Sequence, residues 1–418
     1  MLETSLTLAE QAGRARQAAA VLAGLSTAAK DQALARMAAL VRETREGILE
    51  ANRVDLEAGE RAGLSRALMD RLRLTPERIE GMARGLEEVR ALPDPVGREE
   101  AWRRPNGLLI RRVRVPLGVL AVIYEARPNV TVEAASLCFK AGNACLLRGS
   151  TSARHSNRVL VETLRRALQD SGGPVDAVQA VADMRREAID EMASMRGQID
   201  CLIPRGGADL IQRVVAAARV PVIETGVGNC HLYVHEDADL DMALRIALNA
   251  KTQRPGVCNA IETMLVHRAV AERFLPRAGA ALVGKGVELR GCPLTCRLVP
   301  QARSATPEDW DTEYLDLVLA VRVVEDLDQA LEHIARHGSG HSEAIVTRSL
   351  EAARRFQQEV DACAVYVNAS TRFTDGGEFG FGAEIGISTQ KMHARGPLGL
   401  AELTTVKYLV EGEGQVRA

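Results

Sequence analysis

The sequence has few aromatic residues: they occupy 3% of its 418 positions, although 46% of all residues are hydrophobic. The core is therefore expected to consist mainly of Ala, Leu, Val and Ile. Long apolar runs are also missing: the sequence contains no stretch of about 18 apolar residues, the length needed to span a bilayer. The first twenty residues include acidic and basic side chains, unlike a signal peptide. These absences favour a cytoplasmic protein with reduced thiols that does not enter a membrane.

The chain also lacks an excess of charge of either sign. Its 53 basic and 55 acidic residues give a formal net charge of -2. Such a balance produces no overall field that would attract nucleic acid or a membrane surface. Single arginines can still bind a small anion, so a small molecule is the favoured partner.

Metal ligands at a familiar spacing are absent as well. Cys292 and Cys296 are three residues apart, but no second pair lies nearby to complete a zinc site. His333, His337 and His341 recur every four residues, yet glycines after His337 end the helix. A solvated helix end explains this pattern, and the sequence predicts no metal.

The predicted elements indicate an α/β fold. The first hundred residues predict helices, one of which follows Ser26 as its N-cap and keeps apolar positions on one face as far as Ile48. Beyond residue 117, short apolar runs alternate with helical stretches, which is typical of parallel sheets covered on both faces. The runs predicted as buried strands are Leu117–Ile123, Ala144–Leu147, Ile199–Ile203, Val220–Ile223, His231–Val234, Thr263–Val266, Leu317–Val324, Ala344–Val346 and Ala364–Val367. Gly107–Val115 and Leu403–Val410 predict two further, exposed strands.

The usual dinucleotide signatures are missing, because no GxGxxG follows a strand and no GxxxxGK[ST] occurs. The strands of a doubly wound sheet can still bind a dinucleotide at their carboxyl ends. Two such ends, Leu147–Ser150 and Ile203–Gly207, place a basic residue and small residues before a helix N-terminus, where phosphate binds readily. The alternative is that both are ordinary turns between a strand and a helix.

Cys258 lies on a predicted loop, because Pro255 and Gly256 end the preceding helix and the strand Thr263–Val266 follows. Loops on a rigid scaffold are where nucleophiles are usually presented. The neighbouring Arg254 would favour the thiolate, which is the reactive form. Spacing alone leaves open that Cys258 is a buried structural cysteine, as most cysteines are.

Five segments carry a resemblance to a known family. They are PLGVLAVIYEARPN at Pro116–Asn129, FKAGNACLLRGS at Phe139–Ser150, IETGVGNCHLYV at Ile223–Val234, QRPGVCNAIET at Gln253–Thr263 and FGFGAEIGISTQKMHARGPLGLAELTTVKYLV at Phe379–Val410. The match covers nearly the whole chain, and the last segment is the most specific. Together they resemble the glutamate-5-semialdehyde dehydrogenases, also called gamma-glutamyl phosphate reductases, of the aldehyde dehydrogenase superfamily.

The resemblance implies a fold with two doubly wound α/β domains and a small β ribbon that joins subunits into a homo-oligomer. The boundaries predicted for this chain are 1–104 and 117–228, with a return segment at about 383–399, for the cofactor domain, 229–382 for the catalytic domain, and 105–116 and 400–418 for the oligomerisation ribbon.

The resemblance also implies a reaction, the NADPH-dependent reduction of L-glutamyl 5-phosphate to L-glutamate 5-semialdehyde with release of phosphate, in proline synthesis. Cys258 matches the catalytic cysteine, whose thiolate would displace phosphate and form a thioester. Its backbone N–H and the amide of Asn129 or Asn259 would stabilise the oxyanion. Glu224 looks like the superfamily's general base, although reduction of an acyl phosphate has no hydrolytic step. A glutamate 5-kinase that supplies the labile acyl phosphate would be a partner.

The remaining site residues follow from the same resemblance and from charge. The residues matching the NADP(H) site are Arg148 and Ser150 near the adenine ribose, Pro204, Arg205, Gly206 and Gly207 facing the pyrophosphate, and Glu313 at the nicotinamide ribose. An arginine such as Arg148 would pair with a 2′-phosphate. The candidate substrate-binding residues are Arg127, Arg254, Asn368, Arg372 and Lys391, with Glu125 or Asp375 for the substrate ammonium. The glycine-rich loop 376–382 has the backbone freedom to close over the substrate.

Other functions fit some of the same residues. An aldehyde oxidiser of the same superfamily, which releases a free acid, is allowed by Glu224. A catalytically silent scaffold or binding protein is a second alternative, against which the intact motif around Cys258 argues. A cysteine hydrolase is disfavoured, because no His or Asn shares a recognisable context with Cys258.

Overall fold

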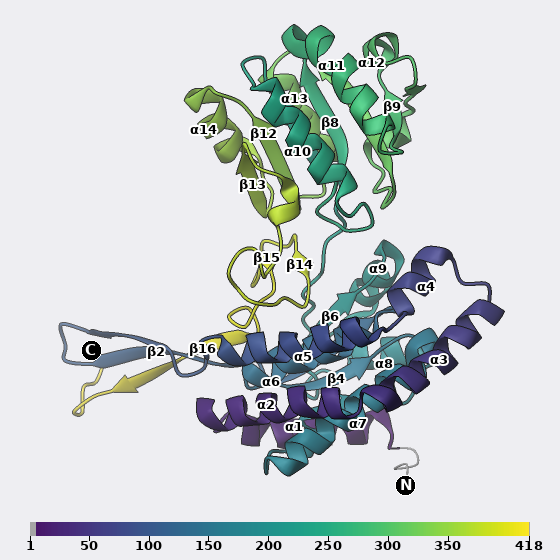
Figure 1. The fold of residues 1–418 in the computed structure, drawn as a ribbon. Coiled ribbons are helices and arrows are strands. Elements are labelled where there is room, and N and C mark those ends of the chain that lie inside the picture. Colours follow the sequence, from purple (N-terminus) through teal and green to yellow (C-terminus); the bar gives the residue numbers. More distant parts are fainter. Residues whose placement is uncertain (1–5, 418) are drawn as a thin grey trace. The chain divides into compact units, whose positions relative to one another are not determined.

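The chain divides into two compact units, which are described separately (Figure 1). The computed structural model describes residues 6–417, except the side chain of Ala67, so residues 1–5 and 418 of the predicted segments lie outside the description. The first unit comprises Met1–Thr225, Gly380–Gly386 and Leu398–Ala418, and the second comprises Gly226–Phe379 and Ile387–Pro397. Within residues 6–417, no helix is long and apolar enough to cross a membrane.

The first unit opens with a layer of helices. Their bounds are Leu8–Leu22 (α1), Thr27–Glu43 (α2), Arg45–Arg61 (α3), Arg66–Leu72 (α4) and Pro76–Ala91 (α5). Ser26 caps α2 as predicted, because its Oγ accepts the N–H of Ala29 at 3.2 Å. The helix predicted to continue to Ile48 instead breaks at Thr44, whose hydroxyl donates to the carbonyl of Leu40 at 2.7 Å. Both helices turn their apolar residues to the same core, so the apolar pattern does not reveal the break.

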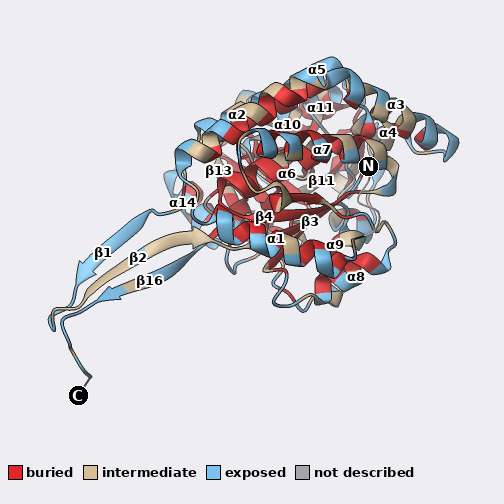
Figure 2. Ribbon diagram, turned by 90° about the horizontal axis from the view of Figure 1, so that it is seen from below, coloured by how far each residue is buried: buried red, intermediate tan, exposed pale blue. Residues whose placement is uncertain are grey.

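A parallel sheet forms the centre of the first unit, with strand order β5-β4-β3-β6. The elements of this α/β part are Val119–Tyr124 (β3), Pro128–Lys140 (α6), Ala144–Arg148 (β4), Arg154–Asp170 (α7), Val178–Ala180 (β5), Glu187–Ser194 (α8), Cys201–Arg205 (β6) and Ala208–Ala217 (α9), with short 3-10 turns at Thr151–Ala153 and Val175–Ala177. Every residue of β3 and β4 is buried (Figure 2). Right-handed crossovers put α6 and α7 on one face and α8 on the other, so this sheet is doubly wound.

One predicted strand and one strand that was not predicted set the sheet apart from the sequence analysis. The run Val220–Ile223 makes only an isolated bridge between Val222 and Leu202. Pro221 has no N–H to donate, so the ladder cannot extend from this bridge back toward Val220. The strand β5 has only three residues, too few to produce an apolar pattern that the sequence would reveal.

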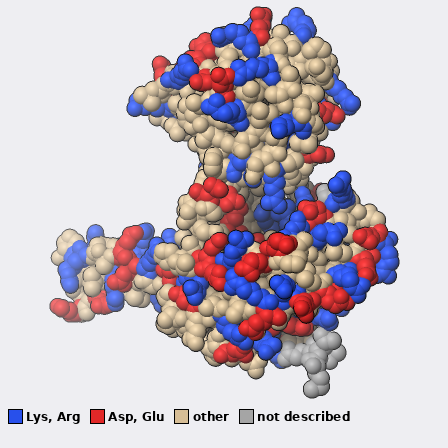
Figure 3. Space-filling model, viewed as in Figure 1, with Lys and Arg blue, Asp and Glu red and all other residues tan. Residues whose placement is uncertain are grey.

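A three-stranded antiparallel ribbon leaves the first unit. It consists of Glu99–Arg103 (β1), Leu109–Pro116 (β2) and Thr404–Glu411 (β16), with β2 in the middle. The two predicted exposed strands correspond to β2 and β16, but β1 lies in the range assigned to the cofactor domain, so the ribbon begins earlier than predicted. Both signs of charge line it (Figure 3), for example in the ion pair of Arg112 and Glu100 at 2.8 Å. Such cross-strand pairs stabilise the ribbon without a buried face.

The second unit contains a seven-stranded parallel sheet of order β10-β9-β11-β8-β7-β12-β13. Its strands are Cys230–Val234 (β7), Ile261–His267 (β8), Glu288–Gly291 (β9), Arg303–Ser304 (β10), Val318–Val324 (β11), Ser342–Val346 (β12) and Ala364–Val367 (β13). Its helices are Leu240–Thr252 (α10), Arg268–Val283 (α11), Pro293–Leu298 (α12), Leu327–His337 (α13) and Leu350–Glu359 (α14), with 3-10 turns at Pro307–Trp310 and Thr371–Phe373. A separate pair, Ile387–Ser388 (β14) and Gly396–Pro397 (β15), divides the predicted return segment 383–399 between the two units.

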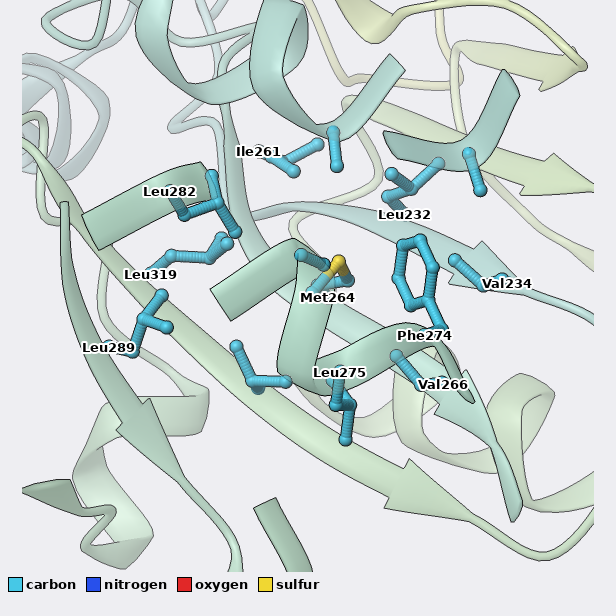
Figure 4. Packing of buried hydrophobic residues seen from close by; sticks show 14 of the residues in the cluster. Leu232, Val234, Ile261, Met264, Val266, Phe274, Leu275, Leu282, Leu289 and Leu319 are labelled. Carbon is cyan, nitrogen blue, oxygen red and sulfur yellow. The ribbon is translucent and has the colours of Figure 1, made fainter. Parts of the chain in front are cut away.

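Two hydrophobic cores cover the two faces of this sheet. Leu232 and Val234 of β7 point to the core under α10 and α11, where Phe274 packs beside them (Figure 4). Tyr233, which lies between them in sequence, points to the core under α13 and α14. This alternation in a strand that is apolar at nearly every position is what a doubly wound sheet requires. The predicted α/β class with two doubly wound units is confirmed.

Candidate active site

In the second unit, the residues that carry chemistry gather at the amino ends of the strands. The loop 253–260 joins α10 to β8, and Cys258 lies three residues before Ile261, the first residue of β8. The Cys258 side chain is half-buried, so its thiol is held by the fold and still reachable. The predicted position of this cysteine, on a loop before a strand, is confirmed.

The neighbouring strand β7 and the residues before it hold the backbone of Cys258 in place. A Cβ atom on Gly228 would lie 1.6 Å from the carbonyl oxygen of Cys258, so no larger residue fits there. Two residues further on, the Cys230 thiol donates a hydrogen bond to the same oxygen over 3.1 Å. Burial raises the pKa of Cys230 well above its usual value, so this thiol stays protonated and keeps donating. The orientation of Cys258 is therefore fixed through its main chain.

Arg372 braces both ends of the same loop. Its Nε donates to Oε1 of Gln253 at 2.8 Å, and its Nη1 donates to Oδ1 of Asn259. The Asn259 amide donates in turn to the carbonyls of Thr374 and Arg372 at 2.8 and 3.3 Å. Burial, followed by the charge of Arg254, lowers the pKa of Arg372, which nevertheless keeps its positive charge. Asn259 is thus fully engaged in holding the loop and is not an oxyanion donor.

Glu313 reaches this frame from the segment before β11. Its Oε1 accepts the N–H of Gly228 at 2.7 Å, and Gly228 is the residue packed against the main chain of Cys258. Through Gly228, the structure therefore brings Glu313 near the main chain of Cys258, which lies 55 positions earlier in the sequence. Their roles, nucleophile and ribose ligand, were predicted independently of this contact.

The other candidates of the second unit lie further from this frame. Arg254 is exposed on the loop itself, while Lys391 is exposed and paired with Asp361. Asn368 follows the carboxyl end of β13, whereas Cys258 lies at the amino ends of the strands. Asn368 exchanges two hydrogen bonds with the backbone of Thr347. Its φ of 58° is a left-handed conformation that asparagine tolerates. Asn368 is therefore not brought to Cys258.

Asp375 and the histidines also differ from what the sequence suggested. The Asp375 carboxylate accepts the N–H of Gly377 at 2.9 Å and so caps the glycine-rich loop. The helix α13 ends at His337 as predicted, but His333 and His341 are buried, not solvated. Within residues 6–417, no group of three or more His, Cys, Asp or Glu side chains is arranged to hold a metal ion.

In the first unit, the candidate residues lie at the carboxyl ends of the strands. Arg148 ends β4, Arg205 ends β6, and β3 between them leads into Glu125 and Arg127. The strand order reverses between β3 and β6, which makes this edge a topological switch point, where open α/β sheets bind ligands. Both turns proposed for phosphate therefore end at one edge of one sheet.

A cavity of about 460 Å³ opens at this edge, beside the ends of β4 and β5. Gly149 and Val181 contribute to its wall, and Arg154 and Arg158 from the start of α7 supply positive charge. This volume is within the range of pockets that hold small ligands. It adds two arginines to the residues that the sequence assigned to this edge.

Arg148 is largely buried and ties this edge together. Its Nη2 donates to the carbonyls of Met184 at 2.9 Å and Arg185 at 3.3 Å. Burial lowers its pKa, and its Nε has no hydrogen-bond partner among the described residues. The Nε–H of the guanidinium is thus a buried donor that no described residue satisfies. Ser150, two residues on, bonds to Ser152 at 2.6 Å.

The turn after β6 already holds a carboxylate. Glu125 accepts the N–H of Gly207 at 3.1 Å, where α9 begins. A Cβ atom on Gly206 would lie 2.8 Å from the Glu125 carboxyl carbon, so the turn is closely packed. An acidic group at a helix N-terminus is what the helix dipole favours. Glu125, predicted as a partner for the substrate ammonium, is instead engaged with this turn. In the same turn, the Pro204 carbonyl accepts a hydrogen bond from the Thr225 hydroxyl at 2.7 Å.

Three further candidates belong to the first unit. Asn129 lies in the first turn of α6, where its amide donates to Glu133 at 2.8 Å. Arg127 is the N-cap residue of the same helix and is half-buried. Glu224 is half-buried and follows the bridge at Val222 near the end of this unit. Asn129 thus has one amide hydrogen bond already committed.

Four residues around Cys258 escaped the sequence analysis: Gly228, Cys230, Lys251 and Glu262. The signal for Glu262 was visible, since a carboxylate inside the apolar strand IETMLVH has to be paired. The other three depend on contacts with distant segments of the chain and leave no local pattern.

Comparison with known proteins identifies the class of protein that this fold and these residues define. The aldehyde dehydrogenase family profile matches residues 4–288. A probable aldehyde dehydrogenase from Listeria monocytogenes, 16% identical, shares the fold with a TM-score of 0.73 over 97% of this chain and 96% of its own. The chain belongs to the aldehyde dehydrogenase family.

Nearer relatives specify the group within that family. A gamma-glutamyl phosphate reductase of Moorella thermoacetica is 59% identical over 100% of both chains. The crystal structure of gamma-glutamyl phosphate reductase from Thermotoga maritima is 50% identical and superposes with a TM-score of 0.95, covering 98% of this chain and 99% of its own. The group is thus that of the gamma-glutamyl phosphate reductases, which are oxidoreductases, as the five resembling segments predicted.

Membership of this family implies a nicotinamide cofactor. The residues at the carboxyl edge of the first unit fit such a group. Arg148 and Arg205 each keep a buried Nε without a hydrogen-bond partner in the described part of the chain, and both lie at strand ends that lead to helix N-termini. Buried donors of this kind are costly unless an anionic ligand meets them.

Proposed function

We propose that this enzyme reduces L-glutamyl 5-phosphate to L-glutamate 5-semialdehyde with NADPH and releases phosphate, as a step of proline biosynthesis. Relatives of high identity are named gamma-glutamyl phosphate reductases. The observation that carries the proposal is the frame around Cys258. Its thiol is half-buried, and its carbonyl oxygen accepts a hydrogen bond from the Cys230 thiol and packs against Gly228. A fixed main chain presents the sulfur in one direction, which is what an attacking nucleophile needs.

The covalent step uses Cys258 as a thiolate. Its Sγ attacks the acyl carbon of the substrate, an S–C bond forms, the C–O bond to phosphate breaks, and phosphate leaves with that electron pair. The negative charge that develops on the acyl oxygen is stabilised by the N–H of Cys258 and by an amide, for which Asn129 is the candidate. Water is not consumed, so Glu224 has no assigned role as a general base here.

The cofactor role is assigned to strand ends of the first unit and to Glu313. When bound, the nicotinamide supplies the hydride that converts the thioester to the aldehyde. We assign Arg148 and Ser150 to the adenine ribose and its 2′-phosphate, and the turn of Pro204, Arg205, Gly206 and Gly207 to the pyrophosphate. A pyrophosphate bound at this turn would have to displace the Glu125 carboxylate from the N–H of Gly207, because two anions do not share one donor.

For the substrate, arginines near the nucleophile loop are favoured. Arg254 is exposed on the loop, and Arg372 adds a second positive charge beside it. Arg127 and Lys391 are proposed for the α-carboxylate. Asn368 is left out of this set, since its amide is bonded to Thr347 at the other edge of the sheet.

The test is an assay in the reverse direction, with glutamate 5-semialdehyde, phosphate and NADP. NADPH should form only when phosphate is present, and Cys258→Ala should abolish its formation while melting temperature and NADP binding stay unchanged. Cys296→Ala, another half-buried thiol of the second unit, is the matched control and should retain activity. NADPH formation without phosphate would show oxidation to a free acid and contradict the proposal.

We also propose a homo-oligomer, a kinase partner and a cytoplasmic location. The ribbon strand β16 exposes Tyr408 and Val410 at a sheet edge, which favours pairing with a second copy. An acyl phosphate is labile, so a glutamate 5-kinase that releases it close by would limit its loss. A thiol nucleophile among eight cysteines without a disulfide suits a reducing compartment.

A further inference from the structure

Two charged side chains of the second unit have no exposed surface and no part in the mechanism above. Lys251, in the last turn of α10, donates to Glu262, the second residue of β8, at 2.5 Å, and both side chains are 0% exposed. They stand on either side of the loop that carries Cys258. The pair therefore closes the base of the nucleophile loop.

Stability alone gives no reason for this pair. Removing two charges from water costs several kcal/mol for each ion, and apolar residues of the same size usually stabilise a core as well. Burial raises the pKa of Glu262 to about 7, while Lys251 beside it opposes that rise. Burial likewise lowers the pKa of Lys251. Each charge is therefore kept in place mainly by the other.

The second oxygen of Glu262 shows what the charge holds. Oε1 accepts the N–H of Leu315 at 3.1 Å. Leu315 has a φ of 54°, a left-handed conformation that costs a leucine free energy and has to be held from outside. Glu313 lies two residues earlier and accepts the N–H of Gly228. The residue between them, Tyr314, places its ring 5.9 Å from the Lys251 ammonium.

We infer that Lys251 and Glu262 are a positioning pair: the Glu262 carboxylate, kept charged by Lys251, holds Leu315 in its left-handed conformation and so aims Glu313 from the frame that carries Cys258. The inference deepens the proposed function, since it rests on Glu313 as the ligand of the nicotinamide ribose. It assigns a role to two residues that touch neither substrate nor cofactor. The nucleophile and the cofactor ligand are thereby set by one buried contact.

Two double variants isolate the contact with Leu315. Lys251→Met with Glu262→Gln removes both charges but keeps an oxygen for the N–H of Leu315. Lys251→Met with Glu262→Leu removes the charges and the oxygen. We expect the dissociation constant of NADP, measured by calorimetry without substrate, to rise a few-fold in the first, because a neutral oxygen holds the N–H of Leu315 more weakly than a carboxylate, and to rise about tenfold in the second. The KM for NADPH should rise with it, and the KM for glutamate 5-semialdehyde should not.

A milder variant and a control separate positioning from folding. Glu262→Asp keeps a negative charge for Lys251 but shortens the side chain by one methylene, so it should weaken NADP binding with little loss of melting temperature. The buried pair of Lys30 and Asp94 in the first unit, at 2.9 Å, is the control. Lys30→Met with Asp94→Leu should change stability and leave NADP affinity unaltered.

The outcomes decide between the two roles. Equal NADP affinity in the two double variants, together with unchanged affinity in Glu262→Asp, would overturn the positioning role and leave a purely structural pair. Adding Leu315→Gly to the leucine variant should recover part of the lost affinity, because glycine adopts the left-handed conformation at no cost. Because NADP binding is measured without turnover, failure of the proposed reaction in the phosphate-dependent assay would be seen separately.

Discussion

In the two parallel sheets, the candidate functional residues lie at opposite ends of the strands, which are called the carboxyl and the amino edge. In the first unit, Arg148, Arg205 and Glu125 follow the carboxyl ends of β4, β6 and β3, at the switch point where such sheets usually bind ligands. In the second unit, Cys258 and Gly228 precede the amino ends of β8 and β7. The candidate cofactor residues thus lie at the carboxyl ends of the strands in one unit, and the candidate nucleophile lies at the amino ends in the other.

This difference changes the source of positive charge. At the first edge, helices α7 and α9 begin beside the candidate residues, and helix N-termini attract anions. The Cys258 loop instead follows the C-terminus of α10, which carries partial negative charge. Side chains have to supply the positive field there, and Arg372 and Arg254 do so. Helix N-termini and arginines both serve the first edge, whereas side chains without a helix N-terminus serve the second.

The largest effect is expected from Gly228→Ala at the nucleophile edge. The new Cβ has to displace the main chain of Cys258, and a misplacement of about 1 Å costs roughly 10²-fold in rate. Gly206→Ala at the binding edge meets only the ends of the Glu125 and Leu210 side chains, which can move, and should weaken cofactor binding mildly. Steady-state kinetics of both, with Gly47→Ala on α3 as control, check the contrast. Equal losses for Gly228 and Gly206 would remove it.

Replacing the cation of the second edge should cost less. Arg372→Met loses charge and the bonds to Gln253 and Asn259, so kcat and the rate of Cys258 alkylation by iodoacetamide should fall about tenfold. Arg254→Met, which makes no bond that braces the loop, should have a smaller effect on alkylation. The reverse order would show that the exposed charge, and not the brace, supports the nucleophile.

At the first edge, Arg148→Ala should weaken NADPH binding by about tenfold and NADH binding by less, because only NADPH carries the 2′-phosphate. The exposed Arg61→Ala on α3 serves as control. An equal loss for the two cofactors would limit Arg148 to its structural bonds with Met184 and Arg185.

A further contrast concerns stability against acid. Burial, then the charges of His231 and His337, lowers the pKa of His333 to about 2 from the ordinary 6.5. Below pH 6.5 the unfolded chain binds a proton that the folded chain refuses, so this contribution is complete above that pH and falls as pH decreases toward 2. Linkage gives a loss of about 2 kcal/mol at pH 5.

His333→Gln keeps an acceptor for Arg322, whose Nη1 lies 3.0 Å from Nδ1 of His333, and removes the titration. Its melting temperature should depend less on pH between 5 and 8 than that of the wild type. The same slope in both proteins would contradict a neutral buried His333. A matched change at the exposed His393 should leave the slope unaltered.

Much of the fold was predictable because it is written locally. A strand such as Val119–Tyr124 is apolar along its length, and Ser26 and Asp239 cap the helices that follow them. The pattern failed where one residue decided the outcome, as at Thr44, where a helix breaks, and at Pro221, where a ladder stops. Elements of two or three residues, such as β10 and β5, are too short to have a period.

The candidate site was predictable only in part. The motif around Cys258 pointed to the nucleophile, and the strand ends around Arg148 and Arg205 pointed to a phosphate edge. Asn259 and Glu125 were misassigned because their polar groups are already bonded, to Arg372 and Thr374 and to Gly207, respectively. Such commitments depend on partners that lie 80 or more residues away, and a local motif carries no record of them.

The sequence by itself determined the α/β class and the family and singled out Cys258 as the candidate nucleophile, because period, composition and motif are local properties of the chain. Only the tertiary structure decided which edge of each sheet carries chemistry and which polar groups are still available. It also showed that Lys251 and Glu262 pair on either side of the loop of Cys258 and that Glu262 accepts the N–H of Leu315. The physical reason is that parallel pairing brings together strands that are distant in sequence, and the role of a buried charge depends on the partner that this pairing places beside it.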